Sequence, residues 1–287
     1  MQAIYRKELK IFFCSPFGWV ITAILLFFMG LFLSVYNLMT GDGDLAYAIS
    51  SMELILAVLI PFLCMRSLAE ERQNRTDRLL DSLPISLRDV VLGKYLSLVT
   101  LFLLPTGVSA LYPLILSSMG NVSLPACYVA FLGYTLMSAA MIALCLFASS
   151  LFENRMIAAL VGIALMLGFY FVDLLANLIP SSPTVSFLLC LLAIAGLCVL
   201  FFRACRQMTL TLMLAALFTV PTAILFALNR ELFSGLVPRF LTRIDLYSRL
   251  GGFLYGHVDL SGVVFYLSFT AFFLLLTVQS MEKRRRV

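Results

Sequence analysis

Residues 67–94 have the sequence SLAEERQNRTDRLLDSLPISLRDVVLGK, a charged segment that separates two long apolar runs. The flanking runs, 49–66 and 95–118, are each close to the ~20 residues that a helix needs to cross a hydrocarbon core. Charged side chains are costly inside a bilayer, so the segment itself must lie outside the lipid. We therefore expect a polar loop with short helices between two membrane-spanning helices.

The composition of the whole chain agrees with this interpretation. Hydrophobic residues make up 62% of the 287 positions and charged residues 12%, against roughly 45–50% and 25% in soluble domains. Eight stretches are long and apolar enough to span a membrane. They are 17–39, 49–66, 95–118, 126–150, 156–176, 184–202, 209–228 and 261–280. We predict an all-α polytopic membrane protein with about eight transmembrane helices, folded as a single membrane domain over residues 1–287.

The distribution of basic residues predicts the orientation, because Lys and Arg gather in short cytoplasmic loops. If the N-terminus is cytoplasmic, all but four of the twenty Lys and Arg residues fall on the inner side. The exceptions share one outer segment and are Arg230, Arg239, Arg243 and Arg249. We expect both termini to be cytoplasmic. This charge follows the inner membrane face, so it indicates anionic lipid as a partner and not nucleic acid.

Residues 1–16 predict an interfacial elbow helix before the first span. Tyr5, Leu9 and Phe12 recur at helical spacing, and a group of basic residues accompanies them. Such a segment is typical of an amphipathic helix that lies in the membrane interface. Pro16 then permits the turn into the bilayer. The alternative is a positively charged flank that only fixes the orientation.

Residues 229–260 predict a second interfacial region, on the outer side. Four apolar residues recur at four-residue spacing, with two arginines on another face. This pattern suits helices that lie on or dip into the outer leaflet. The apolar residues are Leu232, Leu236, Phe240 and Ile244, and the arginines are Arg239 and Arg243. The alternative is a small extracellular cap without lipid contact.

Within 67–94, three positions predict helix starts. Ser67 is a possible cap for a short helix that runs through Arg72, and Thr76 with Asp77 is a possible start for a second. Ser86 and Asp89 form a variant capping box at the start of the helix that continues into the third span. Two short helices attached to membrane helices at both ends would form a lever. The alternative is a solvated loop whose charges only keep it out of the lipid.

Two groups of residues resemble a known family. The loop matches the stretch between the second and third spans of ABC-2 type exporter permeases through Arg66, Glu70-Glu71-Arg72, Thr76, Leu79-Leu80, Leu83-Pro84-Ile85-Ser86 and Val91-Leu92-Gly93-Lys94. The tail resembles the gliding-motility-associated permease branch through Leu246-Tyr247-Ser248-Arg249, Gly256, Asp259-Leu260, Tyr266-Leu267-Ser268, Leu275-Leu276-Thr277 and Glu282-Lys283-Arg284-Arg285. The resemblance covers roughly 1–176 and 229–287. Such permeases usually have six spans, so 184–228 would be an additional pair.

The resemblance implies a non-catalytic membrane subunit of an exporter in a bacterial cytoplasmic membrane. Two permease chains, identical or different, would meet in the membrane above two ABC ATPase subunits. The sequence contains no G-x-x-x-x-G-K-[ST] phosphate loop, so this chain would bind no cofactor and ATP with Mg²⁺ would be bound by the partner ATPase. In family terms Glu70, Glu71 and Arg72 belong to a coupling helix that docks on this partner. We expect Arg75 and Arg78 to add contacts.

A protease signature competes with this interpretation. Residues 70–75 fit E-E-x-x-x-R and residues 253–257 fit F-x-x-x-H, two motifs of the glutamate-dependent intramembrane proteases. That chemistry needs a glutamate beside histidines in one pocket, whereas His257 is the only histidine. The predicted topology also separates Glu70 and His257 by a ~30 Å hydrocarbon core.

Two acidic residues within predicted spans form a third candidate site. Glu53 and Asp173 both fall within a few residues of an outer span end, where hydration lowers the cost of a charge. They are interface-level acids or line an outer vestibule; as a proton or cation relay they would indicate an ion-gradient-driven secondary transporter. The seven scattered cysteines predict small packing residues and neither a disulfide nor a metal set.

Overall fold

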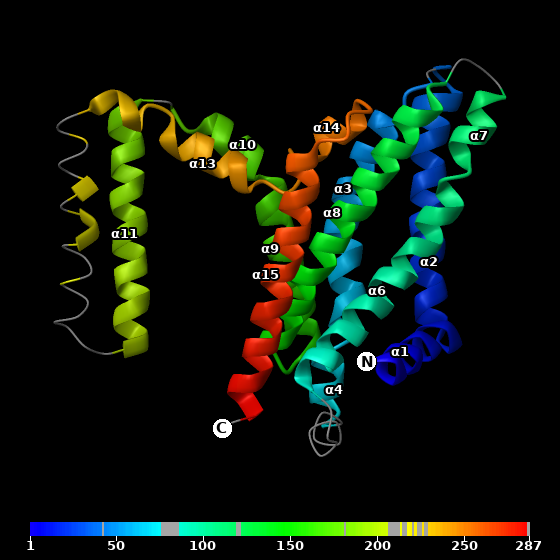
Figure 1. Ribbon diagram of the computed structural model, residues 1–287, viewed down its shortest axis with the longest axis horizontal. Coiled ribbons are helices and arrows are strands. Elements are labelled where there is room, and N and C mark those ends of the chain that lie inside the picture. Colours follow the sequence, from blue (N-terminus) through cyan, green and yellow to red (C-terminus); the bar gives the residue numbers. More distant parts are fainter. Residues whose placement is uncertain are drawn as a thin grey trace. The chain divides into compact units, whose positions relative to one another are not determined.

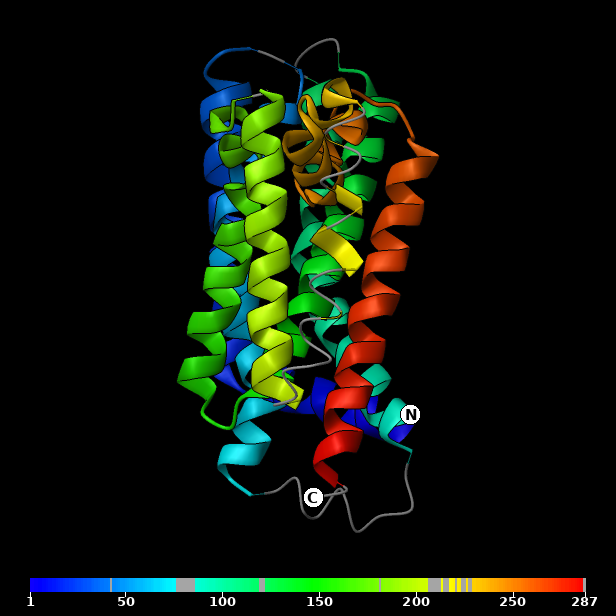
Figure 2. The ribbon, with the colours of Figure 1, turned by 90° about the vertical axis from the view of Figure 1, so that its left-hand side faces the viewer.

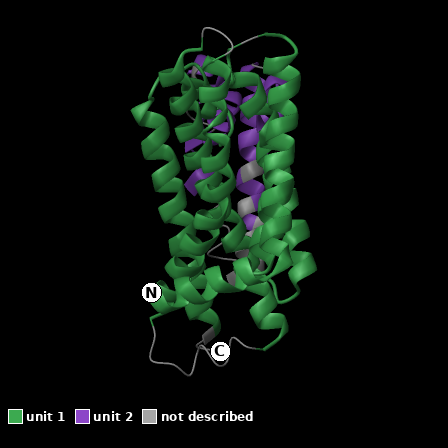
Figure 3. Ribbon diagram, turned by 90° about the vertical axis from the view of Figure 1, so that its right-hand side faces the viewer, with its two compact units in different colours: residues 1–170, 246–287 green, residues 171–245 purple. Residues whose placement is uncertain are grey.

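The computed structural model describes residues 1–41, 43–75, 86–118, 122–180, 182–205 and 229–285, with a few single positions between 206 and 228. Every regular element in these residues is a helix. The chain divides into two compact units (Figure 3). Unit 1 comprises residues 1–170 and 246–287, and unit 2 comprises residues 171–245.

Unit 1 is a helical bundle built around α8, which packs against α3, α6, α9, α14 and α15 (Figure 1). The central position of α8 shows in its apolar stretch, 72% of which is buried. The helices of unit 1 are α1 (Gln2–Cys14), α2 (Pro16–Leu33) with the π-helical turn η1 (Ser34–Leu38), α3 (Ala46–Met65), α4 (Ala69–Gln73), α6 (Leu87–Ser109), α7 (Tyr112–Ser117), α8 (Leu124–Leu151), α9 (Arg155–Tyr170), α14 (Leu250–Leu254) and α15 (Leu260–Arg285).

Five helical stretches of the described chain are long and apolar enough to cross a membrane. They are Pro16–Leu38, Ala46–Gln73, Leu87–Ser117, Leu124–Leu151 and Leu260–Arg284. Arg155–Tyr170 and Val172–Leu178 pass the same criterion when they are taken together, which makes up to six spans. The prediction of a multi-pass, all-helical membrane protein is confirmed, at five to six spans in the described residues instead of eight.

The remaining two predicted spans fall in unit 2. The stretch 184–202 lies within α11 (Pro183–Cys205). The stretch 209–228 lies almost entirely outside the described residues. Unit 2 also contains α10 (Val172–Leu178), the 3₁₀ turn η2 (Arg230–Phe233) and α13 (Leu236–Ile244). The extra helix pair and the single-domain organisation stay predictions.

A sharp corner between α1 and α2 makes the predicted elbow. The Ser15 hydroxyl accepts a hydrogen bond from the Phe17 amide, and Pro16 occupies the first helical position of α2, where its missing N–H costs nothing. A Cβ atom on Gly18 would lie 2.4 Å from the Phe12 carbonyl oxygen, so only glycine permits this close approach. The elbow therefore follows from local sequence.

The buried face of α1 differs from the expected one. Of the predicted stripe, Phe12 is buried and Tyr5 is half-buried, with its hydroxyl 3.0 Å from that of Thr100 on α6. The fully buried residues are Ile4, Glu8 and Phe12, at strict four-residue spacing. A carboxylate therefore occupies the centre of the face that α1 turns towards the bundle.

The two ends of unit 1 carry different structures. The helix α4, the start of α1 and the end of α15 lie at one end (Figure 2), and α14 lies at the other (Figure 1). At the α14 end, the buried Phe253 side chain packs so closely on α8 that a Cβ atom added to Gly133 would lie 2.5 Å from the Cβ of Phe253. The Tyr266 hydroxyl donates a 2.9 Å hydrogen bond to the Leu246 carbonyl. Gly133 and Ser149, which contacts α4, are separated by about 24 Å along α8 at 1.5 Å per residue.

Candidate functional site

The charged loop folds back onto the helix bundle through α4. The Ala69 amide donates a 3.1 Å hydrogen bond to the Ser149 hydroxyl, and the Arg72 guanidinium donates to the Ser150 carbonyl. Both acceptors belong to the last turn of α8. The prediction that Ser67 caps this helix is wrong: the cap position is Leu68, without a side-chain hydrogen bond. The tertiary contact with α8 provides the missing acceptor.

Lys94 is the centre of a buried charge cluster beside α4. Its ammonium lies 2.9 Å from a carboxylate oxygen of Glu8, 2.9 Å from one of Glu71 and 2.9 Å from the carbonyl of Ser67. The Lys94 side chain is only 1% exposed. A lysine ammonium has three N–H donors, and all three find an acceptor here. One side chain of α6 thus joins α1, α4 and the turn between α3 and α4.

The charges around Lys94 are balanced by a second lysine. The ammonium of Lys7 lies 3.4 Å from the other carboxylate oxygen of Glu71, so two lysines face the two glutamates Glu8 and Glu71. Lys7 is half exposed, while Glu71 is 17% exposed. Buried ions are tolerated when they are paired and hydrogen-bonded, and removing one partner of such a pair is strongly destabilising.

A second ion cluster surrounds Glu70 on the neighbouring side of α4. Its carboxylate lies 3.5 Å from the Nε of Arg66 and 3.3 Å from the guanidinium of Arg155, at the start of α9. The Gln73 side chain accepts a 3.3 Å hydrogen bond from the Arg155 amide. The Arg66 guanidinium also lies 4.0 Å from the centre of the Phe17 ring on α2. This cluster is more exposed than the first, so each of its pairs contributes less.

Together these contacts tie α4 to α1, α6, α8 and α9, and we call them the coupling junction. It consists of the charged residues Lys7, Glu8, Arg66, Glu70, Glu71, Arg72, Lys94 and Arg155, with Ser67, Ser149 and Ser150 as further partners. Because short α4 contacts α1, α6, α8 and α9 through directed charges, a displacement of α4 would be carried to those helices.

The local sequence pattern indicates only part of this junction. It selected Glu70, Glu71 and Arg72, and all three side chains contact their own chain. Arg75 is exposed, with a φ of 57° just beyond α4, and Arg78 lies outside the described residues. Glu8 and Lys94 were missed as partners. A signal for Glu8 existed, since it lies four residues from both Ile4 and Phe12.

The predicted capping box at the far end of the loop is confirmed. The Ser86 hydroxyl accepts a 3.2 Å hydrogen bond from the Asp89 amide and donates a 2.7 Å bond to the Asp89 carboxylate. These bonds close the N-terminus of α6 at Leu87. The second short helix predicted at Thr76 and Asp77 falls outside the described residues.

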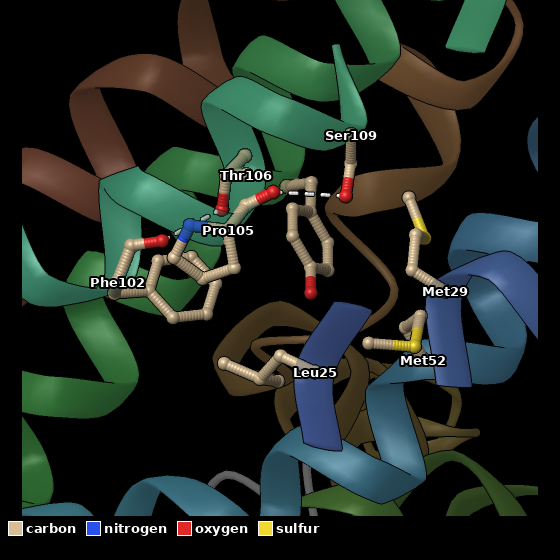
Figure 4. A pocket seen from close by; sticks show the side chains of 8 residues that line it. Leu25, Met29, Met52, Phe102, Pro105, Thr106 and Ser109 are labelled. Carbon is tan, nitrogen blue, oxygen red and sulfur yellow. Dashed lines mark hydrogen bonds between the residues drawn. The ribbon is translucent and has the colours of Figure 1, made fainter. Parts of the chain in front are cut away.

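One small cavity is found within the described part of unit 1. It lies among side chains of α2, α3, α6 and α8, including Met29, Met52 and Thr106 (Figure 4). Its volume is about 10 Å³, the room that one water molecule needs. The hydroxyls of Thr106 and Ser109 donate back to the carbonyls of Phe102 and Pro105 on the same helix. This conformation therefore contains no substrate-sized chamber at that point.

The two acidic residues predicted for an outer vestibule belong to different units. Glu53 is half-buried in α3 of unit 1, and Asp173 is in the first turn of α10 in unit 2, where its carboxylate accepts a 3.3 Å bond from Asn177. A shared vestibule stays a prediction. The protease motifs lie at opposite ends of unit 1: Glu70 is in α4, and His257 follows α14 (Figure 1). No cluster of metal-binding side chains occurs among the residues that the structure describes.

A bundle of apolar helices with a charged junction at one end defines a multi-pass membrane protein. Residues 36–189 match the model of a protein family described as ABC-2 family transporter protein. The match covers more than half of the chain, including α3, α4 and α6 to α9. The chain therefore belongs to the ABC-2 transporter family and is a membrane permease component of an ABC transporter. No curated protein matches the sequence.

Proposed function

We propose that this chain is the transmembrane permease subunit of an ATP-driven exporter in a bacterial cytoplasmic membrane. A separate ABC ATPase subunit binds ATP with Mg²⁺ and hydrolyses it, and a second permease chain, identical or different, completes the transporter. Family membership supports the ATPase partner. The coupling junction is the observation that carries the proposal, because it connects the loop expected to face that partner with α1, α6, α8 and α9. Within the family, the tail motifs favour the gliding-motility-associated branch.

We infer two different tasks within the loop. Glu70, Glu71 and Arg72 hold α4 on the membrane domain, since each of these side chains has a partner in the same chain. Docking on the ATPase then falls mainly to the residues beyond α4, which begin with the exposed Arg75, and we assign Arg78 to the same surface. This division modifies the expectation that the Glu-Glu-Arg triplet itself provides the main contact with the partner.

The junction also provides routes by which a displacement of the loop reaches the membrane helices. ATP-driven closure of the two ATPase subunits moves the docked loop, and α4 moves with it. Lys94 carries this displacement to α6 and, through Glu8, to the elbow helix α1. Glu70 and Arg155 carry it to α9, and the contacts of Ala69 and Arg72 carry it to α8. Helices on several sides of the central α8 therefore respond together.

The test uses the full chain co-expressed with the ATPase encoded beside it or recovered with it from native membranes. Arg75→Glu should abolish co-purification of the ATPase while the permease stays inserted, because only the docking surface changes. The Lys94→Met permease should still co-purify with a substantial share of the ATPase. It should no longer change the rate at which the ATPase hydrolyses ATP. Lys10→Met is the matched control, since Lys10 is an exposed lysine of α1 without an ion pair among the described residues.

Two outcomes would contradict the proposal. The first is co-purification of the ATPase that Arg75→Glu, alone or with Arg78→Glu, leaves undiminished. The second is transport by the purified chain in response to a proton or sodium gradient without any ATPase, which would indicate a secondary transporter.

A further inference from the structure

The helix α13 (Leu236–Ile244) presents an unusual surface. None of its nine residues is buried, although it packs against α10, α11 and η2 within unit 2. The residues of intermediate exposure are Val237, Pro238 and Leu241, which marks the side that faces these neighbours. The opposite side is exposed along the entire helix.

The exposed side is divided lengthwise into an apolar edge and a basic edge. Leu236, Phe240 and Ile244 follow one another at four-residue spacing and are 38%, 61% and 38% exposed. Arg239 and Arg243, one position before Phe240 and Ile244, form the adjacent edge and are both exposed. The helix contains no acidic residue. Two parallel edges of this kind match the boundary between lipid headgroups and acyl chains.

The two arginines on α13 differ from the other two in the same region. The Arg230 guanidinium lies 5.7 Å from the centre of the Phe226 ring. The Arg249 guanidinium donates a 3.2 Å hydrogen bond to Ser261 and lies 5.4 Å from the Phe265 ring. Among the residues that the structure describes, neither guanidinium of α13 has an ion pair or a ring contact. Their charge is available to an external anion.

We propose that α13 lies in the membrane interface and that Arg239 and Arg243 bind the phosphate groups of anionic phospholipids while Phe240 enters the acyl region. The leaflet follows from the charge distribution of the sequence, which predicts that residues 229–260 lie on the side of the membrane opposite the loop that contains α4. With α4 cytoplasmic, this is the outer leaflet. Only the choice of leaflet rests on the proposed function.

A tryptophan placed on α13 provides a direct test, because Trp19 is the only tryptophan of the chain. The full-length double variant Trp19→Phe, Phe240→Trp is reconstituted in vesicles of phosphatidylcholine, alone or mixed with phosphatidylglycerol. The introduced indole should show blue-shifted emission and should be quenched by lipids brominated on their acyl chains. Quenching by brominated phosphatidylglycerol against brominated phosphatidylcholine then measures the preference for the anionic lipid.

The two pairs of arginines supply a charge-matched control. Each arginine near an anionic surface contributes about a fivefold preference, so the pair should favour phosphatidylglycerol over phosphatidylcholine by about 25-fold. Arg239→Gln with Arg243→Gln should remove this preference. Arg230→Gln with Arg249→Gln changes the net charge equally in the same region and should leave the preference intact.

Three results would overturn the inference. The indole emission could stay at the wavelength of water-exposed tryptophan, the preference for phosphatidylglycerol could be absent, or both arginine pairs could reduce it equally. Each result leaves co-purification of the ATPase untouched, so it would not refute the proposed function. Quenching by iodide added only on the side of α4 would instead refute the leaflet, and with it the topology on which export depends.

Discussion

At the scale of the residue, Lys94 shows how strongly the stability of the protein can depend on one buried cation. Its ammonium is almost completely buried and has three oxygen acceptors at 2.9 Å. Lys94→Met would leave Glu8 and Glu71 without their shared cation, so we expect a loss of about 3–5 kcal/mol in unfolding free energy. Thermal and denaturant unfolding of the detergent-purified protein measures this loss. Lys10→Met should change the stability by less than about 0.5 kcal/mol; equal stability of both variants would show that the cluster is dispensable.

A pair of glycines allows a second test at this scale, away from all charges. A Cβ on Gly133 would lie 2.5 Å from the Cβ of Phe253, whereas nothing lies within 4 Å of the corresponding position on Gly107. Gly133→Ala should therefore cost about 1–3 kcal/mol through overpacking. Gly107→Ala should leave stability unchanged or raise it by up to about 1 kcal/mol. The same unfolding assay separates them, and a neutral Gly133→Ala would contradict the tight seat of α14.

At the scale of the element, the two loop serines separate what sequence can predict from what it cannot. The cap at Ser86 was predictable, because all its atoms lie within four consecutive residues. The start of α4 was not, because the acceptor for the Ala69 amide is Ser149, which is 80 positions away. The Ser67 hydroxyl is instead buried without a hydrogen-bond partner.

The same two serines give the prediction that belongs to this scale. Ser86→Ala removes a side-chain cap and should destabilise the protein by about 1 kcal/mol, with faster amide exchange in the first turn of α6. Ser67→Ala removes a buried hydroxyl that gains nothing from the fold, so stability should stay equal or increase slightly. Unfolding and hydrogen exchange on both variants provide the measurement. A larger loss for Ser67→Ala than for Ser86→Ala would reverse the assignment of the cap.

The membrane helices could be predicted from the length of the apolar runs, but their contacts with one another could not. Five predicted spans correspond to helices in unit 1, because long apolar runs need no tertiary information. The face of α1 was harder, since the burial of Glu8 depends on Lys94, which lies 86 positions away. In the same way, the partners of Glu70 on α9 and of Arg72 on α8 lie 85 and 78 positions away. Pairing across the bundle is what the local pattern does not contain.

At the scale of the whole molecule, the decisive property is the side of the membrane that each end of unit 1 faces. The end with α4 also carries the exposed basic side of α1, and such charge predicts that this end faces the cytoplasm. The opposite end carries α14 and Tyr255, which is 75% exposed. We therefore expect a reagent that cannot cross the bilayer to reach the α4 end only from the cytoplasmic side and the α14 end only from outside.

Cysteine labelling tests this last prediction. Cys14 is exposed at the end of α1, so a membrane-impermeant maleimide should label it in inverted vesicles and not in intact cells. Tyr255→Cys in a Cys14→Ser background should show the reverse pattern, and Cys14→Ser alone is the control for the other thiols. Labelling of Cys14 from outside would place the coupling junction on the wrong side for a cytoplasmic ATPase. Because α4 and α14 are held about 24 Å apart along α8, both probes must reverse together if the orientation is inverted.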